Sequence, residues 1–151
     1  MVKDVIDANK ELIKNYPFLL PHNRWTDKVS DDYDFSYTEL DAMPTGWRNA
    51  FGEKMCEELK AELDKVGFTE QYRIMQIKEK YGMLRWYDNG ATEEMYAIIA
   101  KFEELSKRIC IVCGTPATKV STGWVSPYCD KCAPDDSIPI EDYYAEVNCN
   151  V

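Results

Sequence analysis

Four cysteines near the end of the chain have the spacing of ligands that share one metal ion. They form two C-x₂-C pairs, Cys110 with Cys113 and Cys129 with Cys132. Two thiolates three residues apart on a tight turn can hold one side of a tetrahedral ion, and a second pair carried by a hairpin can close the other side. The spacing therefore predicts a zinc ribbon with Zn²⁺ as its cofactor.

The chemistry expected of this site is structural. Four sulfur ligands leave Zn²⁺ no position for water or substrate, so the metal should stabilise the fold instead of activating a reactant. The alternative is four unlinked thiols, which fits poorly with two paired spacings and with Gly114 directly after the first pair. Because a segment of about 26 residues buries little surface, metal binding should supply much of its stability.

Two elements must position the cysteines. A helix is predicted from Thr92, its N-cap, to about Lys107, and it leads almost directly into the first pair. Its apolar stripe consists of Met95, Ile98, Ile99, Phe102 and Leu105. Between the pairs, Ser121-Thr122-Gly123 predicts a hairpin turn. Of the aromatics beside this turn, Trp124 and Tyr128 are expected to pack against the neighbouring domain; stacking on a base is the alternative.

The rest of the chain predicts an α+β fold: amphipathic helices packed on a small antiparallel sheet, with a C-terminal zinc ribbon of four cysteine ligands. Hydrophobic spacing predicts helices over 4–15 and from Thr45, as N-cap, to about Val66, where Gly67 ends the second one. Residues 72–87 predict a β-hairpin that turns at Tyr81-Gly82, and residues 22–43 an ordered loop or short strand. We divide the chain into an α+β domain (1–107), a zinc ribbon (108–133) and an acidic tail (134–151).

Charge limits the class of partner. The chain carries a net charge of −9, and its last eighteen residues hold five acids and no base. Such a surface repels phosphate backbones and attracts cations, so direct nucleic-acid binding is disfavoured and a protein partner with a basic surface is expected.

Two segments combine exposed acids with aromatic residues in a way that suits a basic groove. The candidate partner-binding residues are Asp31, Asp32, Asp34 and Tyr37 in the first segment, and Asp135, Asp136, Glu141, Asp142, Tyr143 and Tyr144 in the second. Together they suggest one acidic surface. The alternative for the tail is a terminus that only increases solubility.

The predicted hairpin carries a possible anion-binding group: Lys78, Lys80 and Arg85. These cations could converge near its tip. The alternative is a solvent-facing surface with cross-strand ion pairs and Arg85 stacked beside an aromatic ring.

The hairpin and the ribbon also carry a family resemblance. The string Ile77-Lys-Glu-Lys-Tyr-Gly-Met-Leu-Arg-Trp-Tyr87, followed by Cys110-x₂-Cys113-Gly114, Gly123-Trp124 and Cys129-x₂-Cys132, resembles a family of small uncharacterised proteins from phages and bacterial genomes. It covers roughly residues 70–133. The resemblance implies a phage- or prophage-associated protein with a C-terminal zinc ribbon and attaches no activity to it. Many members have histidine at the position of Cys132, and either residue binds zinc.

Location follows from what the sequence does not contain. No apolar run approaches the eighteen residues that a membrane span needs, and the charged N-terminus is unlike a signal peptide. We therefore expect the cytoplasm, that of a bacterial host cell if a phage encodes the chain, where thiols stay reduced. No role is assigned to Cys56, Cys149 or His22, and the oligomeric state stays open.

Three functions compete. The first is a non-enzymatic, zinc-stabilised, acidic protein-binding module, in its narrowest form an anti-CRISPR-like inhibitor of a host nucleic-acid-binding or defence protein. The second is a nucleic-acid-binding regulator that acts through cations of the ribbon, such as Lys107, Arg108 and Lys119. An enzyme ranks last, because no paired acid and base, phosphate loop or open metal site can be recognised.

Overall fold

The computed structural model describes residues 2–90 and 92–149, with side chains described up to residue 145. Glu146 and Cys149, the last acid and the last cysteine of the chain, thus lie outside the described side chains.

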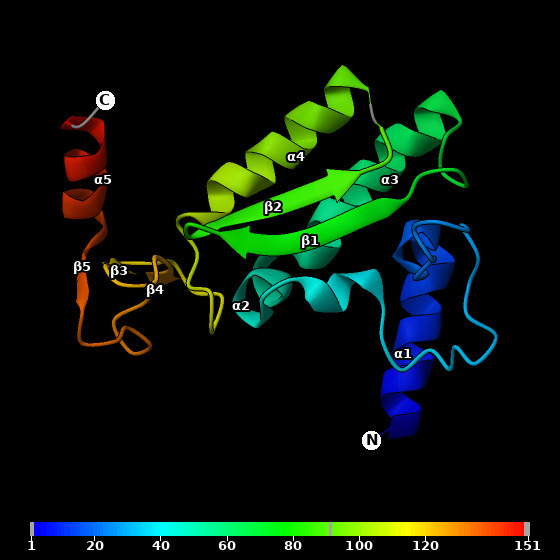
Figure 1. Cartoon of the computed structure of the whole chain (residues 1–151), viewed down its shortest axis with the longest axis horizontal. Helices are drawn as coiled ribbons and strands as arrows, with labels where there is room; N and C mark the ends of the chain where they lie inside the picture. The colour runs from blue at the N-terminus through cyan, green and yellow to red at the C-terminus, as the bar shows by residue number, and fades with distance from the viewer. Residues whose placement is uncertain (1, 91, 150–151) are drawn as a thin grey trace.

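A two-stranded antiparallel sheet packs on two helices, which confirms the α+β prediction. The strands are β1 (Ile74–Lys80) and β2 (Met83–Asp88), joined by the predicted turn at Tyr81-Gly82. In Figure 1 they lie in front of α3 (Glu53–Val66) and α4 (Glu93–Ser106), so the helices cover one face of the sheet and leave the other face open. The core between these layers holds mainly large apolar side chains, among them Leu59, Leu63, Tyr72, Leu84, Met95 and Phe102.

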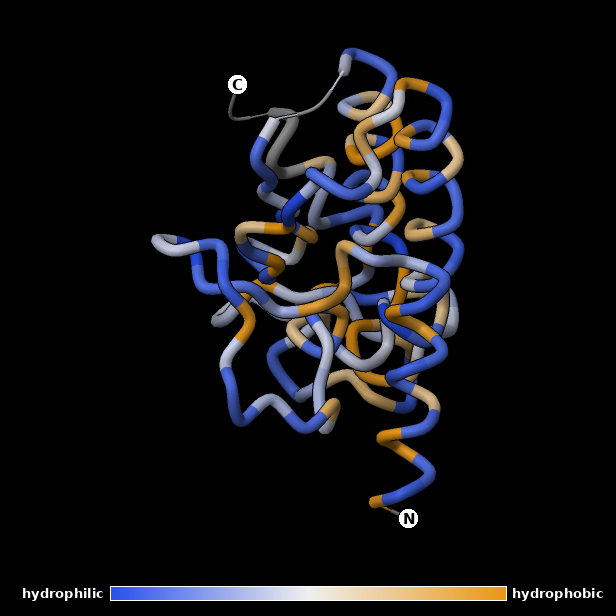
Figure 2. The backbone as a smooth tube through the Cα atoms, turned by 90° about the vertical axis from the view of Figure 1, so that its right-hand side faces the viewer, coloured by the Kyte–Doolittle hydropathy of each residue, from blue (hydrophilic) through white to orange (hydrophobic). Residues whose placement is uncertain are grey.

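The periodicity of the two long helices identified their buried faces correctly except near the ends. Val66 and Leu105 were expected in the apolar stripes, yet both are exposed. On α4 the neighbouring Ser106 takes the buried position against β2 instead of Leu105. Hydrophobic residues gather inside the molecule and hydrophilic ones lie along its periphery, as Figure 2 shows. Gly67 ends α3 in the left-handed conformation, and the Thr92 side chain caps α4, both as predicted.

The predicted helix over residues 45–66 is one helical stretch in three parts. It begins with α2 (Thr45–Trp47), continues through a π-helical turn, η3 (Arg48–Gly52), and ends as α3. Thr45 is the first helical residue and not the cap, which is Pro44. No side chain caps this end, because the Gly46 N–H donates to the backbone oxygen of Ile111, 2.9 Å away.

The N-terminal part of the chain packs against one end of this body. It consists of α1 (Val2–Asn15), the 3₁₀ turns η1 (Pro17–Leu19) and η2 (Glu39–Ala42), and the loop between these turns. The loop lies on α1, where the Asn9 side chain donates to the backbone oxygen of Phe35 at 2.8 Å. Residues 22–38 thus form an ordered loop, with no strand among them.

The C-terminal part builds a second small sheet. Its strands β3 (Lys119–Ser121), β4 (Pro127–Tyr128) and β5 (Ser137–Pro139) run antiparallel in the order β4-β3-β5. The tail therefore adds a strand to the ribbon hairpin and continues as α5 (Ile140–Cys149). The sequence did not predict this strand, because three residues with a proline carry almost no strand pattern.

Candidate metal centre

The four predicted ligands converge on one point. The Sγ atoms of Cys110, Cys113, Cys129 and Cys132 all lie within 4.8 Å of one another, and those of Cys113 and Cys129 are 3.6 Å apart. Tetrahedral coordination with metal–sulfur bonds of about 2.3 Å would separate the sulfur atoms by about 3.8 Å. The arrangement therefore fits a single ion held by four thiolates.

The first cysteine pair sits on a turn that needs glycine. The Gly114 N–H donates to the Cys110 oxygen at 3.0 Å, and the Cys110 N–H donates to the Thr115 oxygen at 2.7 Å. Gly114 has a φ of +83°, and a Cβ at this position would lie 2.6 Å from the backbone oxygen of Gly46. Only glycine tolerates both the positive φ and the lack of room for a Cβ. The resulting turn directs Cys110 and Cys113 toward the same point.

The second pair forms a similar turn at the end of β4. The Cys132 and Ala133 N–H groups both donate to the Cys129 oxygen, at 3.2 and 3.1 Å. Outside the turn, the Thr118 hydroxyl donates to the Asp130 carboxylate at 2.5 Å and ties this pair to the segment before β3. The Ile111 N–H also donates to the Pro127 oxygen at 3.0 Å, so a backbone hydrogen bond joins the segments that carry the two pairs.

The centre is attached directly to the main body through α2. Gly46 bonds to Ile111 as described, and the indole nitrogen of buried Trp47 donates to the Ile109 oxygen at 2.9 Å. A Cβ on Gly46 would lie 2.1 Å from the Cys110 oxygen. The backbone next to the first ligand therefore touches the start of the helix, with no room for a side chain.

The four thiols differ in burial and in how readily they ionise: hydrogen bonding with Cys129 raises the pKa of Cys132 to about 12, so its thiolate depends on the metal. Cys110 is buried and Cys113 is exposed, while Cys129 and Cys132 are half-buried. Hydrogen bonding from Thr115, whose Oγ1 lies 3.0 Å from the Cys113 sulfur, lowers the pKa of Cys113 and so favours its thiolate. Sequence reasoning missed Thr115, Gly46 and Trp47, because supporting contacts of this kind leave no motif.

Four protein ligands would saturate the ion, so the arrangement suits a structural metal and not metal-bound water. Within the described residues, this is the one group of three or more His, Cys, Asp or Glu side chains placed to share a metal ion.

The two acidic segments lie at opposite ends of the molecule, which corrects the expectation of one acidic surface. The loop after α1 is at the right in Figure 1 and the tail with α5 is at the left. They separate because the loop packs on α1 while β5 pairs with β3.

In the tail, three of the candidate residues, Asp136, Tyr143 and Tyr144, make intramolecular contacts. The Asp136 carboxylate accepts from the Gly123 N–H at 2.8 Å, and the Tyr144 ring lies under both Lys107 and Arg108. Asp135, Glu141 and Asp142 are exposed, and Tyr143 is half-buried against Tyr144.

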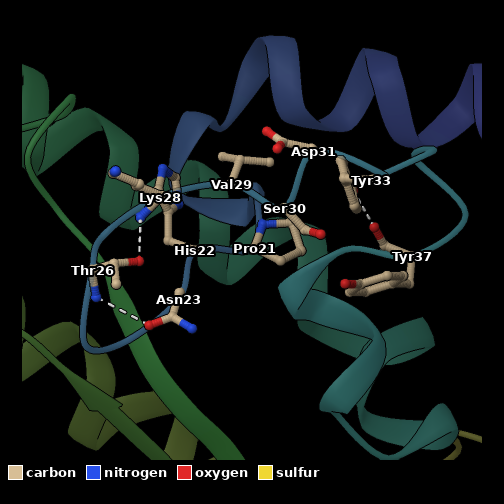
Figure 3. A pocket seen from close by; sticks show the side chains of 10 residues that line it. All are labelled: Pro21, His22, Asn23, Thr26, Lys28, Val29, Ser30, Asp31, Tyr33 and Tyr37. Atoms are coloured by element: carbon tan, nitrogen blue, oxygen red, sulfur yellow. Dashed lines mark hydrogen bonds between the residues drawn. The ribbon is translucent and has the colours of Figure 1, made fainter.

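In the loop, the three aspartates and Tyr37 are exposed. Asp31 and Tyr37 line a cavity of about 470 Å³, with Tyr33, His22 and Lys28 also at its wall (Figure 3). The structure thus brings together two of the predicted partner-binding residues from this segment. The remaining lining residues are Pro21, Asn23, Thr26, Val29 and Ser30.

Trp25, which the sequence did not single out, stands beside this cavity and is 93% exposed. Its loop is closed by backbone hydrogen bonds from Asn23 to Lys28 and from Asp27 to Asn23, of 2.9 and 2.8 Å. The Asn23 side chain accepts hydrogen bonds from the N–H groups of Trp25 and Thr26. Asparagine often stabilises turns in this way, so Asn23 could have predicted the turn from the sequence.

The candidate anion-binding residues share one face of the hairpin. Lys78 pairs directly with Arg85 and Lys80 with Met83. Lys78 lies over the Tyr87 ring and Lys80 over the Tyr81 ring, at 5.9 and 5.8 Å from the ring centres. The alternative of cross-strand ion pairs does not hold, since the ion pairs among the described residues involve none of the three cations.

His22 and Cys56, to which the sequence assigns no role, lie in different surroundings. The Nδ1 atom of His22 lies 2.7 Å from the Leu20 oxygen. Cys56 lies in the core, and burial raises the pKa of its thiol to about 12.

Comparison with known families, curated proteins and solved structures finds no match to this chain. The family resemblance therefore stays a prediction. Across the described part of the chain, each helix is too short or too polar to cross a bilayer.

Proposed function

We propose that this chain is a non-catalytic binding protein that docks on a basic protein partner through residues 22–37, here named the acidic loop. One observation carries the proposal: Asp31 and Tyr37 line the same cavity, at the base of the turn that presents Trp25.

The turn is preorganised for recognition. Besides its backbone bonds, it is anchored by Arg73, whose Nε donates to the Asp27 carboxylate at 2.7 Å. The hydrogen-bonded backbone of this turn needs little ordering on binding, and tryptophan is among the residues that most often dominate interface energies. Trp25 would thus serve as the hydrophobic anchor of the contact.

The cavity suits a cationic side chain. A guanidinium or ammonium group entering it would meet the Asp31 carboxylate and the rings of Tyr33 and Tyr37. Lys28 also lines the cavity and would repel a cation, so the neighbouring carboxylates of Asp32 and Asp34 must provide the net attraction. No ion pair among the described residues involves Asp31, Asp32 or Asp34, and their charges are therefore available to a partner.

The metal proposed for the four cysteines is Zn²⁺, which takes four thiolates in tetrahedral geometry and performs no redox chemistry. It would hold the ribbon against α2. Native mass spectrometry should find one zinc ion per chain, and a folded, metal-free protein would contradict this assignment.

The alternative, a nucleic-acid-binding regulator that uses ribbon cations, has less support. Lys107 pairs with Glu104, and both Lys107 and Arg108 lie over the Tyr144 ring of the tail. Two of the cations are thus occupied within the molecule. Encoding by a phage and inhibition of a host defence protein form a narrower version of our proposal, and they rest on the family resemblance alone.

The test uses two variants with equal charge change at opposite ends. In the first, Asp31→Asn, Asp32→Asn and Asp34→Asn neutralise the acidic loop; in the second, Asp135→Asn, Glu141→Gln and Asp142→Asn neutralise the tail. An arginine-rich peptide is titrated into each isotope-labelled protein and followed by NMR.

The proposal predicts that the peptide shifts the Trp25 indole signal and the amides of the acidic loop, and that only the loop variant weakens binding. Equal weakening in both variants would reveal nonspecific charge attraction and overturn the proposal. Shifts confined to α5 would overturn it as well.

A further inference from the structure

The open face of the β1–β2 hairpin has a composition unlike the rest of the molecule. Ile77, Leu84 and Trp86 face the core, so the alternation of a strand places Lys78, Lys80 and Arg85 on the opposite face. The helices lie behind the sheet, and this face is open in Figure 1. A chain with a net charge of −9 thus presents three neighbouring cations on one small surface.

Two carboxylates of this region, those of Glu79 and Glu103, accept hydrogen bonds from backbone N–H groups. The Glu79 carboxylate accepts from the Gly82 N–H at 3.0 Å, and that of Glu103 accepts from the Trp86 N–H at 3.1 Å. Burial raises the pKa of Glu103, while the Trp86 N–H and the charge of Arg85 act in the opposite direction. The Nε atom of Arg85 is itself buried with no hydrogen-bond partner. Lys78, Lys80 and Arg85 outnumber Glu79 and Glu103, so the net charge of this group is positive.

A cleft opens where the tip of this hairpin meets the ribbon turn. It has a volume of about 350 Å³ and is lined by Glu79, Lys80, Tyr81, Gly123, Trp124 and Val125. Tyr81 is 76% exposed and Trp124 is 78% exposed. The expectation that Trp124 packs against the neighbouring domain is thus wrong: its turn carries the ring to the rim of the cleft.

Both walls of the cleft are fixed. Gly82 touches the ribbon so closely that a Cβ there would lie 3.2 Å from the Val125 side chain. On the other wall, Gly123 donates to Asp136, and the Ser121 hydroxyl bonds to the Trp124 oxygen. The backbone at Tyr81 and at Trp124 is therefore fixed so that both side chains line one cleft.

We propose that this cleft and the adjoining basic face bind a nucleobase that carries a phosphate, as in a single-stranded nucleic acid or a free nucleotide. The base would stack on Trp124 and Tyr81, and the phosphate would lie against Lys80 with Lys78 and Arg85 behind it. An aromatic peptide would use the rings but leave the three cations unmatched. The site is independent of the acidic loop, which lies at the other end of the sheet (Figure 1).

The overall negative charge does not exclude this site, but it should determine its affinity and the dependence of binding on salt. Repulsion from the rest of the surface should make binding weak at physiological salt and stronger at low salt, where the local cations act on the phosphates. The net charge argues against nucleic-acid binding by the surface as a whole. It does not argue against binding at one basic site, because a charge sum does not show how the charges are distributed.

The experiment measures fluorescence anisotropy of a short fluorescein-labelled oligothymidylate with the full-length, zinc-loaded protein at low salt. Binding should weaken about tenfold in Trp124→Ala, from the loss of one stacking platform, and similarly in Lys78→Ala/Lys80→Ala. Lys80→Arg should retain it. Trp25→Ala, which removes a still more exposed tryptophan at the other end, serves as the matched control and should bind the oligothymidylate as the original protein does.

Competition distinguishes the two sources of the ligand. Displacement by adenosine monophosphate would support a site for one nucleotide, and displacement by unlabelled oligothymidylate alone would support a site for a strand. Displacement by inorganic phosphate as effective as that by the oligonucleotide would overturn the proposal, because stacking would then contribute nothing. Absence of binding at low salt, or equal loss in Trp25→Ala, would also overturn it.

Discussion

At the scale of single residues, the four cysteines can be tested directly as zinc ligands. The test replaces one thiol with a side chain of known affinity for zinc. Serine has the size of cysteine but is a poor zinc ligand, whereas imidazole is a common one. The half-buried position of Cys132 leaves space for a ring.

The first prediction concerns this residue. Cys132→Ser should lose most of the bound zinc and lower the melting temperature by several degrees, while Cys132→His should keep about one ion per chain. Elemental analysis and thermal unfolding measure the two effects. Retention of full zinc content in the serine variant would show that Cys132 is not a ligand.

Cys56, in contrast to the four ligand cysteines, is expected to be chemically unreactive. It has no exposed surface, and burial raises the pKa of its thiol to about 12, so it should present almost no thiolate near neutral pH. We predict that iodoacetamide leaves Cys56 unmodified in the native protein and alkylates it after denaturation, as peptide mass spectrometry would show. Rapid native labelling would mean that this part of the core opens.

At the scale of elements, the joint between α2 and the first cysteine pair depends on Gly46. An alanine there would gain helix propensity, but its Cβ would lie 2.1 Å from the Cys110 oxygen and 2.6 Å from the Ile111 carbonyl carbon. Backbone atoms cannot rotate away, so the clash should outweigh the gain.

We therefore predict that Gly46→Ala destabilises the protein by about 1–3 kcal/mol and weakens zinc retention. Gly52→Ala is the matched control in the same helical stretch, since its new methyl would meet only the flexible side chains of Arg48 and Leu40, at 3.3 Å or more. Urea unfolding measures both. A neutral Gly46→Ala would mean that the ribbon is not packed on α2.

A second element-scale prediction concerns the edge of β2 that bonds to side chains of α4. The hydroxyl of buried Ser106, on α4, accepts from the Leu84 N–H at 2.8 Å. Ser106→Ala would leave this buried N–H without a partner and should cost about 1–3 kcal/mol of unfolding free energy. Exposed Ser36→Ala should change it by less than about 0.5 kcal/mol. Equal values from urea unfolding would contradict this role of Ser106.

At the scale of the whole molecule, three distinct regions are arranged along the long axis (Figure 1). The acidic loop lies at one end, the basic face of the hairpin in the middle, and the ribbon with its tail at the other end. The ribbon is the region that should depend on metal, because its own buried surface is small.

Metal removal gives the last prediction. A zinc chelator should speed hydrogen exchange over residues 108–133 and at the start of α2, which bonds to Ile109 and Ile111. Exchange in the middle of α3 and α4 should change little, because the sheet covers them. Added zinc should restore protection. Unchanged exchange over 108–133 would contradict a structural metal.

The sequence by itself determined the features that depend on local spacing. The C-x₂-C pairs identified all four converging thiols, and the 3.6-residue period with its caps identified α3, α4 and their buried faces. These features follow from neighbouring residues alone, because turn and helix geometry fix which side chains share a face.

Only the tertiary structure decided what depends on packing between distant segments. It placed Lys78 beside Arg85, brought Trp124 to a cleft with Tyr81, and paired β5 with β3. It also put the two acidic segments at opposite ends. The short strands and turns involved can pair in several ways at similar local free energy, so the choice among them rests on the packed core and on contacts such as that of Gly46 with Ile111.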